Sequence, residues 1–399
     1  MNTLKVAPKK IITKTIWQLS LVSLFTDMAS EMLYPVMPVF LKSIGFSIIL
    51  IGILEGLAEA VAGLSKSYFG KMSDASGKRL PFVQLGYSLS AISKPMMALF
   101  VYPAWIFFSR TTDRLGKGIR TAARDALLSD ECSKENKARV FGFHRSMDTM
   151  GAVIGPLLAL LFLYFYPNQY KLLFFMAFIP GLFAIVATLL IKEKIKPAIK
   201  AVNLKQISFF SFVTYWKTSP AAYKKLVSGL LLFALFNSSD IFLLLKLKES
   251  GITDTALIGI YIFYNLVFAI VAYPLGILAD KIGLKKIFIG GLLLFAVVYA
   301  GFAINTNLLV FIALFFLYGI YAAATEGIAK AWICNLVTPA ETATAIGTYT
   351  GFQSIAALLA SSITGLLWFN FGATLTFLIT AIATIAIAIY LAVTKFSKD

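Results

Sequence analysis

A short phrase that occurs twice, 206 positions apart, constrains this chain more than any other feature. The first copy starts at Gly70 and reads Gly-Lys-Met-Ser-Asp-Ala-Ser-Gly-Lys-Arg. The second starts at Gly276 and reads Gly-Ile-Leu-Ala-Asp-Lys-Ile-Gly-Leu-Lys-Lys. Both copies share Gly-x-x-x-Asp-x-x-Gly followed by basic residues, and each lies between two apolar stretches. A repeat at about half of the chain length predicts two structurally similar halves.

Long apolar blocks predict that the chain crosses a membrane many times. Of the 399 residues, 59% are hydrophobic and 14% are charged, and a helix needs about 20 apolar residues to cross the hydrocarbon layer. The fourth, fifth and tenth candidates carry internal charges, and we include them because the repeat requires six spans in each half. The predicted spans are 16–41, 47–70, 80–101, 103–128, 140–166, 170–191, 223–247, 255–279, 286–304, 307–331, 341–369 and 372–394.

The repeat and the spans together predict an all-α membrane protein, with twelve transmembrane helices in two pseudo-symmetric six-helix bundles. We expect an N-terminal bundle at 1–192, a basic cytoplasmic linker at 193–222 and a C-terminal bundle at 223–399. Internal repeats of this kind are typical of secondary transporters, which move a small molecule across the bilayer.

The net charge of +17 does not indicate nucleic-acid binding, because the basic residues are spread among loops instead of gathered on one face. They precede the first span, follow the second, fourth and eighth, and fill the stretch between the sixth and seventh. Since basic loops stay in the cytoplasm, we expect both termini to be cytoplasmic. The predicted location is the plasma membrane (the inner membrane of a bacterium), with the lipid bilayer as partner.

Charged side chains inside the predicted spans are the candidates for function. An unpaired charge at mid-membrane costs about 2.5–3.5 kcal/mol, so these groups must line a wet cavity or pair with one another. Both readings stay open for each residue, although Glu326 and Lys330 have the spacing of an intrahelical ion pair. The candidates for proton coupling or substrate binding are Asp27, Glu31, Glu55, Glu59, Arg110, Arg114, Asp148, Asp240 and Glu326.

Enzyme, metal and cofactor motifs were not found. The chain has no His-Glu-x-x-His, Gly-x-Ser-x-Gly or P-loop phrase, so we expect no enzyme activity, no cofactor and no metal site. His144 is the only histidine. It lies near the predicted cytoplasmic end of the fifth span, where we expect a solvated or capping side chain, although a proton relay with Asp148 is the alternative.

The doubled phrase resembles the cytoplasmic loop motif of the major facilitator superfamily, and the resemblance covers nearly the whole chain. The first copy has Ala75 where the family motif has a base, whereas the second keeps Lys281. In the family the motif aspartate acts as a latch between the halves, and the loop bases pair with acids at the end of the fourth helix. The implied latch residues are Gly70, Asp74, Gly77, Lys78, Arg79, Asp125 (with Asp130 as the other candidate acid), Gly276, Asp280, Gly283 and Lys285.

Two further motifs are similar to those of the same family. The fifth span carries Gly142, Gly151, Gly155 and Pro156, which resemble the antiporter motif of its drug-exporting members, although the motif's final glycine pair is absent. The fourth span resembles the family's arginine-bearing motif, in which either Arg110 or Arg114 could be the functional base. The resemblance places the first, fourth, seventh and tenth helices around a central cavity.

The function expected from these patterns is export of a small organic molecule by a monomer in exchange for protons. Asp27 or Glu31 would carry the proton, with Arg110 or Arg114 reaching toward them. The alternative is a transporter of organic or inorganic anions that uses the fourth-helix arginines. An exporter of metal ions is a weaker alternative, because one histidine and two cysteines suit soft metals poorly.

Overall fold

The computed structural model describes residues 11–34, 36–193 and 211–396, and within these ranges every long element is a helix. The first half contains α1 (Lys14–Glu31), α2 (Met37–Ser43), α3 (Ile48–Ser76), α4 (Leu80–Leu99), α5 (Pro103–Asp130), α6 (Lys137–Phe165) and α7 (Tyr170–Leu189). The second contains α8 (Ser211–Thr218), α9 (Ala221–Ala234), α10 (Ile241–Glu249), α11 (Asp254–Ile282), α12 (Leu284–Ile304), α13 (Leu308–Leu336) and α14 (Thr342–Val393).

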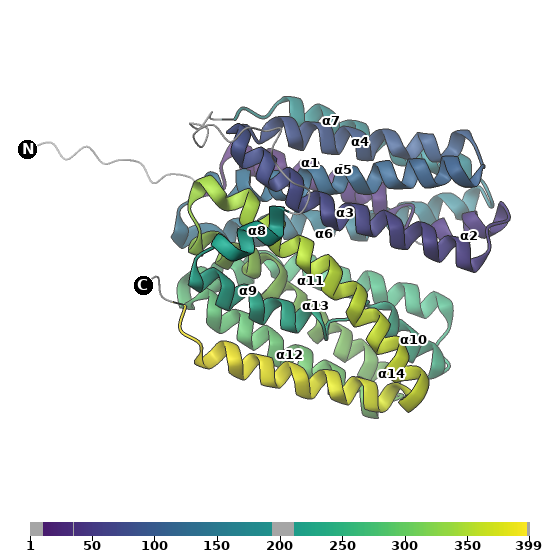
Figure 1. Ribbon diagram of the computed structural model, residues 1–399. Helices are drawn as coiled ribbons and strands as arrows, with labels where there is room; N and C mark the ends of the chain where they lie inside the picture. The colour runs from purple at the N-terminus through teal and green to yellow at the C-terminus, as the bar shows by residue number, and fades with distance from the viewer. Residues whose placement is uncertain (1–10, 35, 194–210, 397–399) are drawn as a thin grey trace, which may run out of the picture.

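The helices form two bundles that lie side by side, α1 to α7 in one and α9 to α14 in the other (Figure 1). In the first bundle, α4 packs on α5 and α7, and α1 packs on α6 and α7. In the second, α12 packs on α13 and α14, and α11 packs on α13. The bundles meet mainly where α6 packs on α11 and α3 packs on α14.

Two spans consist of two helices each, and one helix contains two spans. The first span is α1 followed by α2, the seventh is α9 followed by α10, and α14 contains two spans joined at Gly372, whose backbone is not helical. The breaks in the first and seventh spans lie about half a chain apart, as the sequence repeat predicts. With these pairs joined, the helices give the twelve expected spans, which confirms the predicted fold class.

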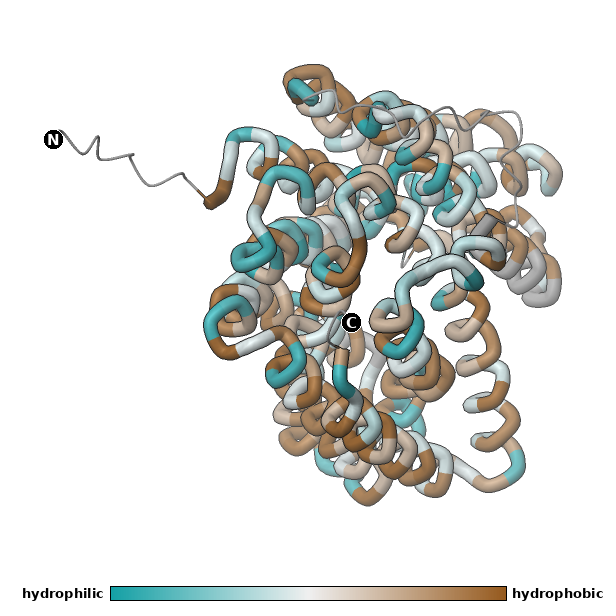
Figure 2. Tube along the Cα trace, turned by 60° about the vertical axis from the view of Figure 1, so that its left-hand side comes forward, coloured by the Kyte–Doolittle hydropathy of each residue, from teal (hydrophilic) through white to brown (hydrophobic). Residues whose placement is uncertain are grey.

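Hydropathy alone selects six helices of the described residues as able to cross a membrane. They include α6, α7 and four helices of the second half, while α4, α5 and the broken spans are not selected. The second bundle is the more uniformly apolar of the two (Figure 2). The charged spans of the first bundle are tolerated because their charges are buried against other helices.

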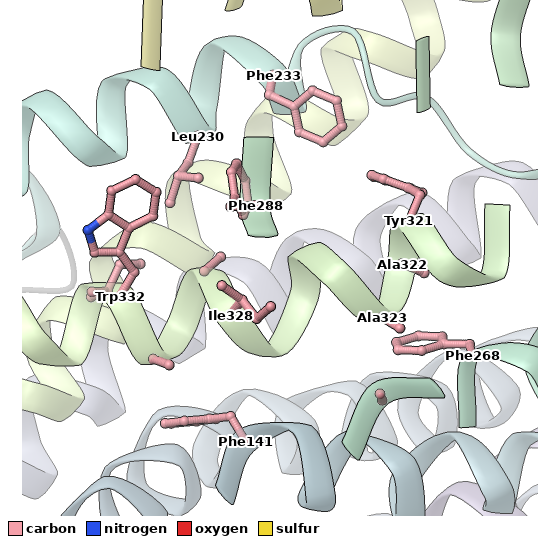
Figure 3. Close-up of a cluster of buried hydrophobic side chains, with 14 of the residues drawn as sticks. Phe141, Leu230, Phe233, Phe268, Phe288, Tyr321, Ala322, Ala323, Ile328 and Trp332 are labelled. Carbon is pink, nitrogen blue, oxygen red and sulfur yellow. The ribbon is translucent and has the colours of Figure 1, made fainter. Parts of the chain in front are cut away.

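The apolar core extends across the contact between the bundles. Ile328 of α13 lies between Phe141, which comes from α6 of the first bundle, and Leu230 and Phe288 of the second (Figure 3). All four side chains are at most 2% exposed. Helix α13 therefore packs tightly on both bundles, and charges on it lie within reach of the first.

Candidate functional site

The two motif aspartates each cap a helix of the opposite bundle. The Asp74 carboxylate accepts hydrogen bonds from the backbone N–H groups of Ala343 (3.3 Å) and Thr344 (2.6 Å) and from the Thr344 hydroxyl (2.8 Å), at the start of α14. The Asp280 carboxylate accepts from the N–H groups of Ala138 (3.0 Å) and Arg139 (2.8 Å), at the start of α6. A carboxylate is favoured there because helix N-termini carry unpaired N–H groups and a positive dipole end.

The two motif aspartates lie beyond the predicted ends of their spans, but they are still helical. Both lie in the last turns of long helices, α3 and α11, which continue beyond the predicted ends of the spans. Gly77 and Gly283 follow as C-terminal caps with φ of 65° and 107°, a conformation that favours glycine. The motif therefore ends a helix, and it places the aspartate one turn before that end.

The first glycine of each motif copy allows helices of the two bundles to touch. A methyl group at Gly70 would lie 2.5 Å from the carbonyl oxygen of Ala343, and one at Gly276 would lie 2.4 Å from that of Ala138. Any larger residue would push α3 away from α14, or α11 away from α6. The first glycine and the aspartate of each motif copy thus stabilise the same contact, α3 with α14 in the first copy and α11 with α6 in the second.

Of the two candidate acids at the end of the fourth span, the loop base Arg79 pairs with Asp130 and not with Asp125. Arg79 binds Asp74 and Asp130, each at 3.1 Å, and donates to the carbonyl oxygen of Pro339 at 2.8 Å. Lys78 is exposed. The Lys285 Nζ donates to the carbonyl oxygens of Ala392 (2.6 Å) and Thr394 (3.0 Å) at the end of α14, so this contact stays inside the second bundle.

Asp125 joins the bundles, and it does not pair with the loop bases. Its carboxylate, which is fully buried, lies 2.9 Å from Arg124 of the same helix and 2.6 Å from the Lys330 Nζ of α13. Arg124 and Lys330 are 206 positions apart, so the repeat places them at equivalent positions around one shared anion. That spacing is the signal by which the sequence could have identified Arg124.

A second ion cluster also crosses between the bundles. Arg145 of α6 binds Asp148 (2.7 Å) and Glu326 of α13 (2.7 Å), and the Ser23 hydroxyl donates to Asp148. The intrahelical pair expected between Glu326 and Lys330 is therefore wrong: both residues bind partners on the first bundle, because α13 packs against it.

His144 is not the solvated or capping residue expected from its position. It is 2% exposed, its Nδ1 lies 3.5 Å from the Ser20 hydroxyl, and Arg124, Asp125 and Asp148 are its charged neighbours. The helix carries it into the bundle because α6 packs along α1. His144 thus lies buried among the charged residues Arg124, Asp125 and Asp148.

The fourth-helix bases lie in ion pairs of the first bundle. Arg110 is 3.5 Å from Asp113, which also binds the Lys94 Nζ at 2.7 Å, and all three are buried. Arg114 is 3.6 Å from Glu59, whose side chain is 49% exposed. Arg114 is thus the base that reaches an accessible carboxylate. Asp113 was not among the candidate site residues, although it follows Arg110 by one helical turn.

Asp27 and Glu31 differ from the other acids of the first bundle. Within the described part of the chain, neither carboxylate has a hydrogen-bond donor or a Lys or Arg nitrogen in contact, and the Glu31 Oε2 is buried. Lys117 is a cationic neighbour of both acids. The expected ion pair between Asp27 or Glu31 and Arg110 or Arg114 is thus not among the contacts of the described residues. The side chain of Glu55 lies outside the described residues.

Helix α14 lines two cavities. One, of about 570 Å³, lies between α3 and α14 and is lined by Glu59, Lys66 and Gln353 among others. The other, of about 50 Å³, lies inside the second bundle and is lined by Asn237, Glu326 and again Gln353. Charged groups from both bundles therefore border the space along α14.

The glycines of α6 bring it into backbone contact with α1 and α11. A methyl group at Gly142 would lie 2.5 Å from the carbonyl oxygen of Ala272 on α11. At Gly151 and Gly155 it would lie 2.4 Å and 2.6 Å from carbonyl oxygens of α1. Pro156 lies inside α6 without ending it. These positions let one helix connect the two bundles closely.

Asp240 lies apart from these clusters, at the start of α10. It accepts a hydrogen bond from the Tyr318 hydroxyl at 2.7 Å. Among the residues that the structure describes, no group of three or more His, Cys, Asp or Glu side chains could hold a metal ion.

Two bundles of six spans, joined by helix caps at one end and bordered by charged cavities, define a transporter that crosses the membrane many times. The chain belongs to the Major Facilitator Superfamily, whose family model matches residues 19–263 and 241–399. Members of this family are transporters, so the chain is not an enzyme.

Several known proteins resemble the chain. An uncharacterized MFS-type transporter of Methanocaldococcus jannaschii is 33% identical over 366 residues, which cover 90% of this chain and 89% of that protein. The quinolone resistance protein NorA of Staphylococcus aureus is 25% identical over 122 residues, 31% of each chain.

Two solved structures share the fold. The human organic anion transporter MFSD10 has a TM-score of 0.77 at 15% identity, over 94% of this chain and 98% of its own. The transporter FucP in its outward conformation has a TM-score of 0.76 at 13% identity, over 96% and 99%.

Proposed function

We propose that this protein exports a small organic molecule in exchange for protons, by alternating access. The observation that carries the proposal is the contrast among the first-bundle acids. Asp113, Asp125 and Asp148 are each held by Lys or Arg, whereas Asp27 and Glu31 have no such partner within the described residues. A carboxylate without a fixed counter-ion can take up and release a proton as its surroundings change between wet and dry.

Two arguments support export as the direction of transport: the orientation of the chain in the membrane and the similarity to one relative. The distribution of basic residues among the loops supports an orientation with the capped end and both termini in the cytoplasm. The Asp74 and Asp280 caps then close the cytoplasmic side of the arrangement seen here. The partial similarity to a quinolone resistance protein favours export. We further propose that the functional unit is a monomer in the plasma membrane, divided at the linker 193–222.

Transport of an anion is the second candidate. It is favoured by Arg114 and Lys66, which flank the partly exposed Glu59 beside the larger cavity. A substrate carboxylate or phosphate could displace Glu59 and bind the arginine with two parallel hydrogen bonds. The human organic anion transporter shares only the fold, so it supports this candidate weakly.

The test uses purified protein in liposomes with an internal pH-sensitive dye, screened with cationic, neutral and anionic compounds. Asp27→Asn or Glu31→Gln should abolish transport driven by a pH gradient while substrate exchange at equal pH continues, because exchange moves no net proton. Glu135→Gln, an exposed acid outside the cavity, is the matched control. Normal gradient-driven transport in both variants would refute proton coupling by these residues. A response to anions alone would favour the second candidate.

A further inference from the structure

The break in the seventh span exposes backbone oxygens inside the second bundle. Helix α9 ends at Ala234 and α10 begins at Ile241. Within the described residues, the carbonyl oxygens of 235–238 accept no hydrogen bond from backbone or side chain. The C-terminal end of a helix also carries partial negative charge. In transporters, unwound carbonyls and half-helix ends of this kind coordinate cations.

Three side-chain oxygens at the break are buried without a hydrogen-bond partner. They are the Asn237 Oδ1, the Ser238 Oγ and the Tyr299 hydroxyl of α12. Ser238 is 5% exposed and Tyr299 is fully buried, and the Tyr299 hydroxyl neighbours both Ser238 and Asp240. Buried polar groups nearly always have a partner, so these three oxygens are candidate ligands for a bound species.

The carboxylate at the break favours a cation over a neutral or anionic species. Asp240 accepts a hydrogen bond from Tyr318, and no Lys or Arg nitrogen of the described residues lies within 4.0 Å of it. A water molecule could supply hydrogen bonds but would leave the carboxylate uncompensated. One carboxylate among neutral oxygens suits a monovalent ion, since Ca²⁺ sites usually contain several carboxylates.

We propose that the break between α9 and α10 binds an alkali-metal cation. The proposed ligands are Asp240, Ser238, Asn237, Tyr299 and the backbone carbonyls of 235–238. This site is separate from the proton site proposed on α1, and either could exist without the other.

The position of the site connects it to closure of the bundles. Tyr318, which binds Asp240, lies on α13 two helical turns before Glu326. Glu326 in turn binds Arg145 of the first bundle. Binding of a cation would fix the carboxylate against Tyr318, and it would thereby favour one placement of α13 over others.

The test measures binding of radioactive sodium, and of potassium by competition, to the purified full-length protein at constant ionic strength maintained with choline. We expect saturable binding that Asp240→Asn abolishes. Ser238→Ala and Tyr299→Phe should each weaken it roughly tenfold, because each removes one neutral oxygen ligand. Ser239→Ala, a neighbouring exposed serine, is the matched control and should bind normally.

Thermal unfolding of the same samples checks that each variant is folded. The wild type should melt at higher temperature in Na⁺ or K⁺ than in choline, and Asp240→Asn should melt alike in all three. The proposal fails if the folded wild type binds neither ion, or if Asp240→Asn binds as the wild type does. Loss of gradient-driven transport in Asp27→Asn with sodium binding retained would support the two sites as independent.

Discussion

The two motif aspartates should hold the bundles together with unequal strength. Asp74 makes three hydrogen bonds to the start of α14 and an ion pair with Arg79, and it is 5% exposed. Asp280 makes two hydrogen bonds and is less buried. Asn keeps one acceptor oxygen but loses the charge. We therefore expect Asp74→Asn to destabilise the closed arrangement by about 3 kcal/mol, and Asp280→Asn by about 1.4 kcal/mol.

A native thiol can report this change. Cys334 lies at the capped end of α13, is 1% exposed, and its carbonyl oxygen accepts a hydrogen bond from the Lys137 Nζ across the interface. In a Cys132→Ser background, the rate of its alkylation by a maleimide should measure how often this end opens. The rate should rise roughly a hundredfold in Asp74→Asn and roughly tenfold in Asp280→Asn.

The control is Glu249→Gln, which removes an acid from the end of α10, where Glu249 binds Trp368. Its alkylation rate should match that of the background protein. Equal rates in background and Asp74→Asn, with both folded, would show that the caps do not hold this end closed. A larger effect in Asp280→Asn than in Asp74→Asn would refute the reasoning from burial and bond number.

Two further predictions concern packing and buried charge. Gly142→Ala should lower the melting temperature and speed Cys334 alkylation, because its methyl group would meet the Ala272 carbonyl at 2.5 Å; Gly290→Ala, with nothing within 4 Å, should change neither. Asp125→Asn should destabilise by about 3–5 kcal/mol because it leaves Arg124 and Lys330 as two buried cations, whereas Lys330→Gln leaves an intact pair and should cost less. Melting curves of the Asp125→Asn and Lys330→Gln variants measure the two losses of stability, and equal losses would contradict this account.

The sequence by itself determined the spans, their number and the two-fold repeat. These follow from local properties: each span must satisfy its own backbone hydrogen bonds in lipid, and the last glycine of each motif copy ends its helix. The positions of Asp74 and Asp280 at the ends of equivalent helices were also fixed by the repeat. Even the charged fourth span could be placed, because six spans in one half require six in the other.

Only the tertiary structure decided which charges pair. Glu326 and Lys330 have ideal spacing for each other, yet they bind Arg145 and Asp125 of the opposite bundle, because an intrahelical pair contributes only about 0.2–0.5 kcal/mol. The burial of His144 and the isolation of Asp27 likewise depend on neighbours far away in the chain. Periodicity gives the face of a helix on which a charge lies, but the packing of a second helix determines which group meets it there.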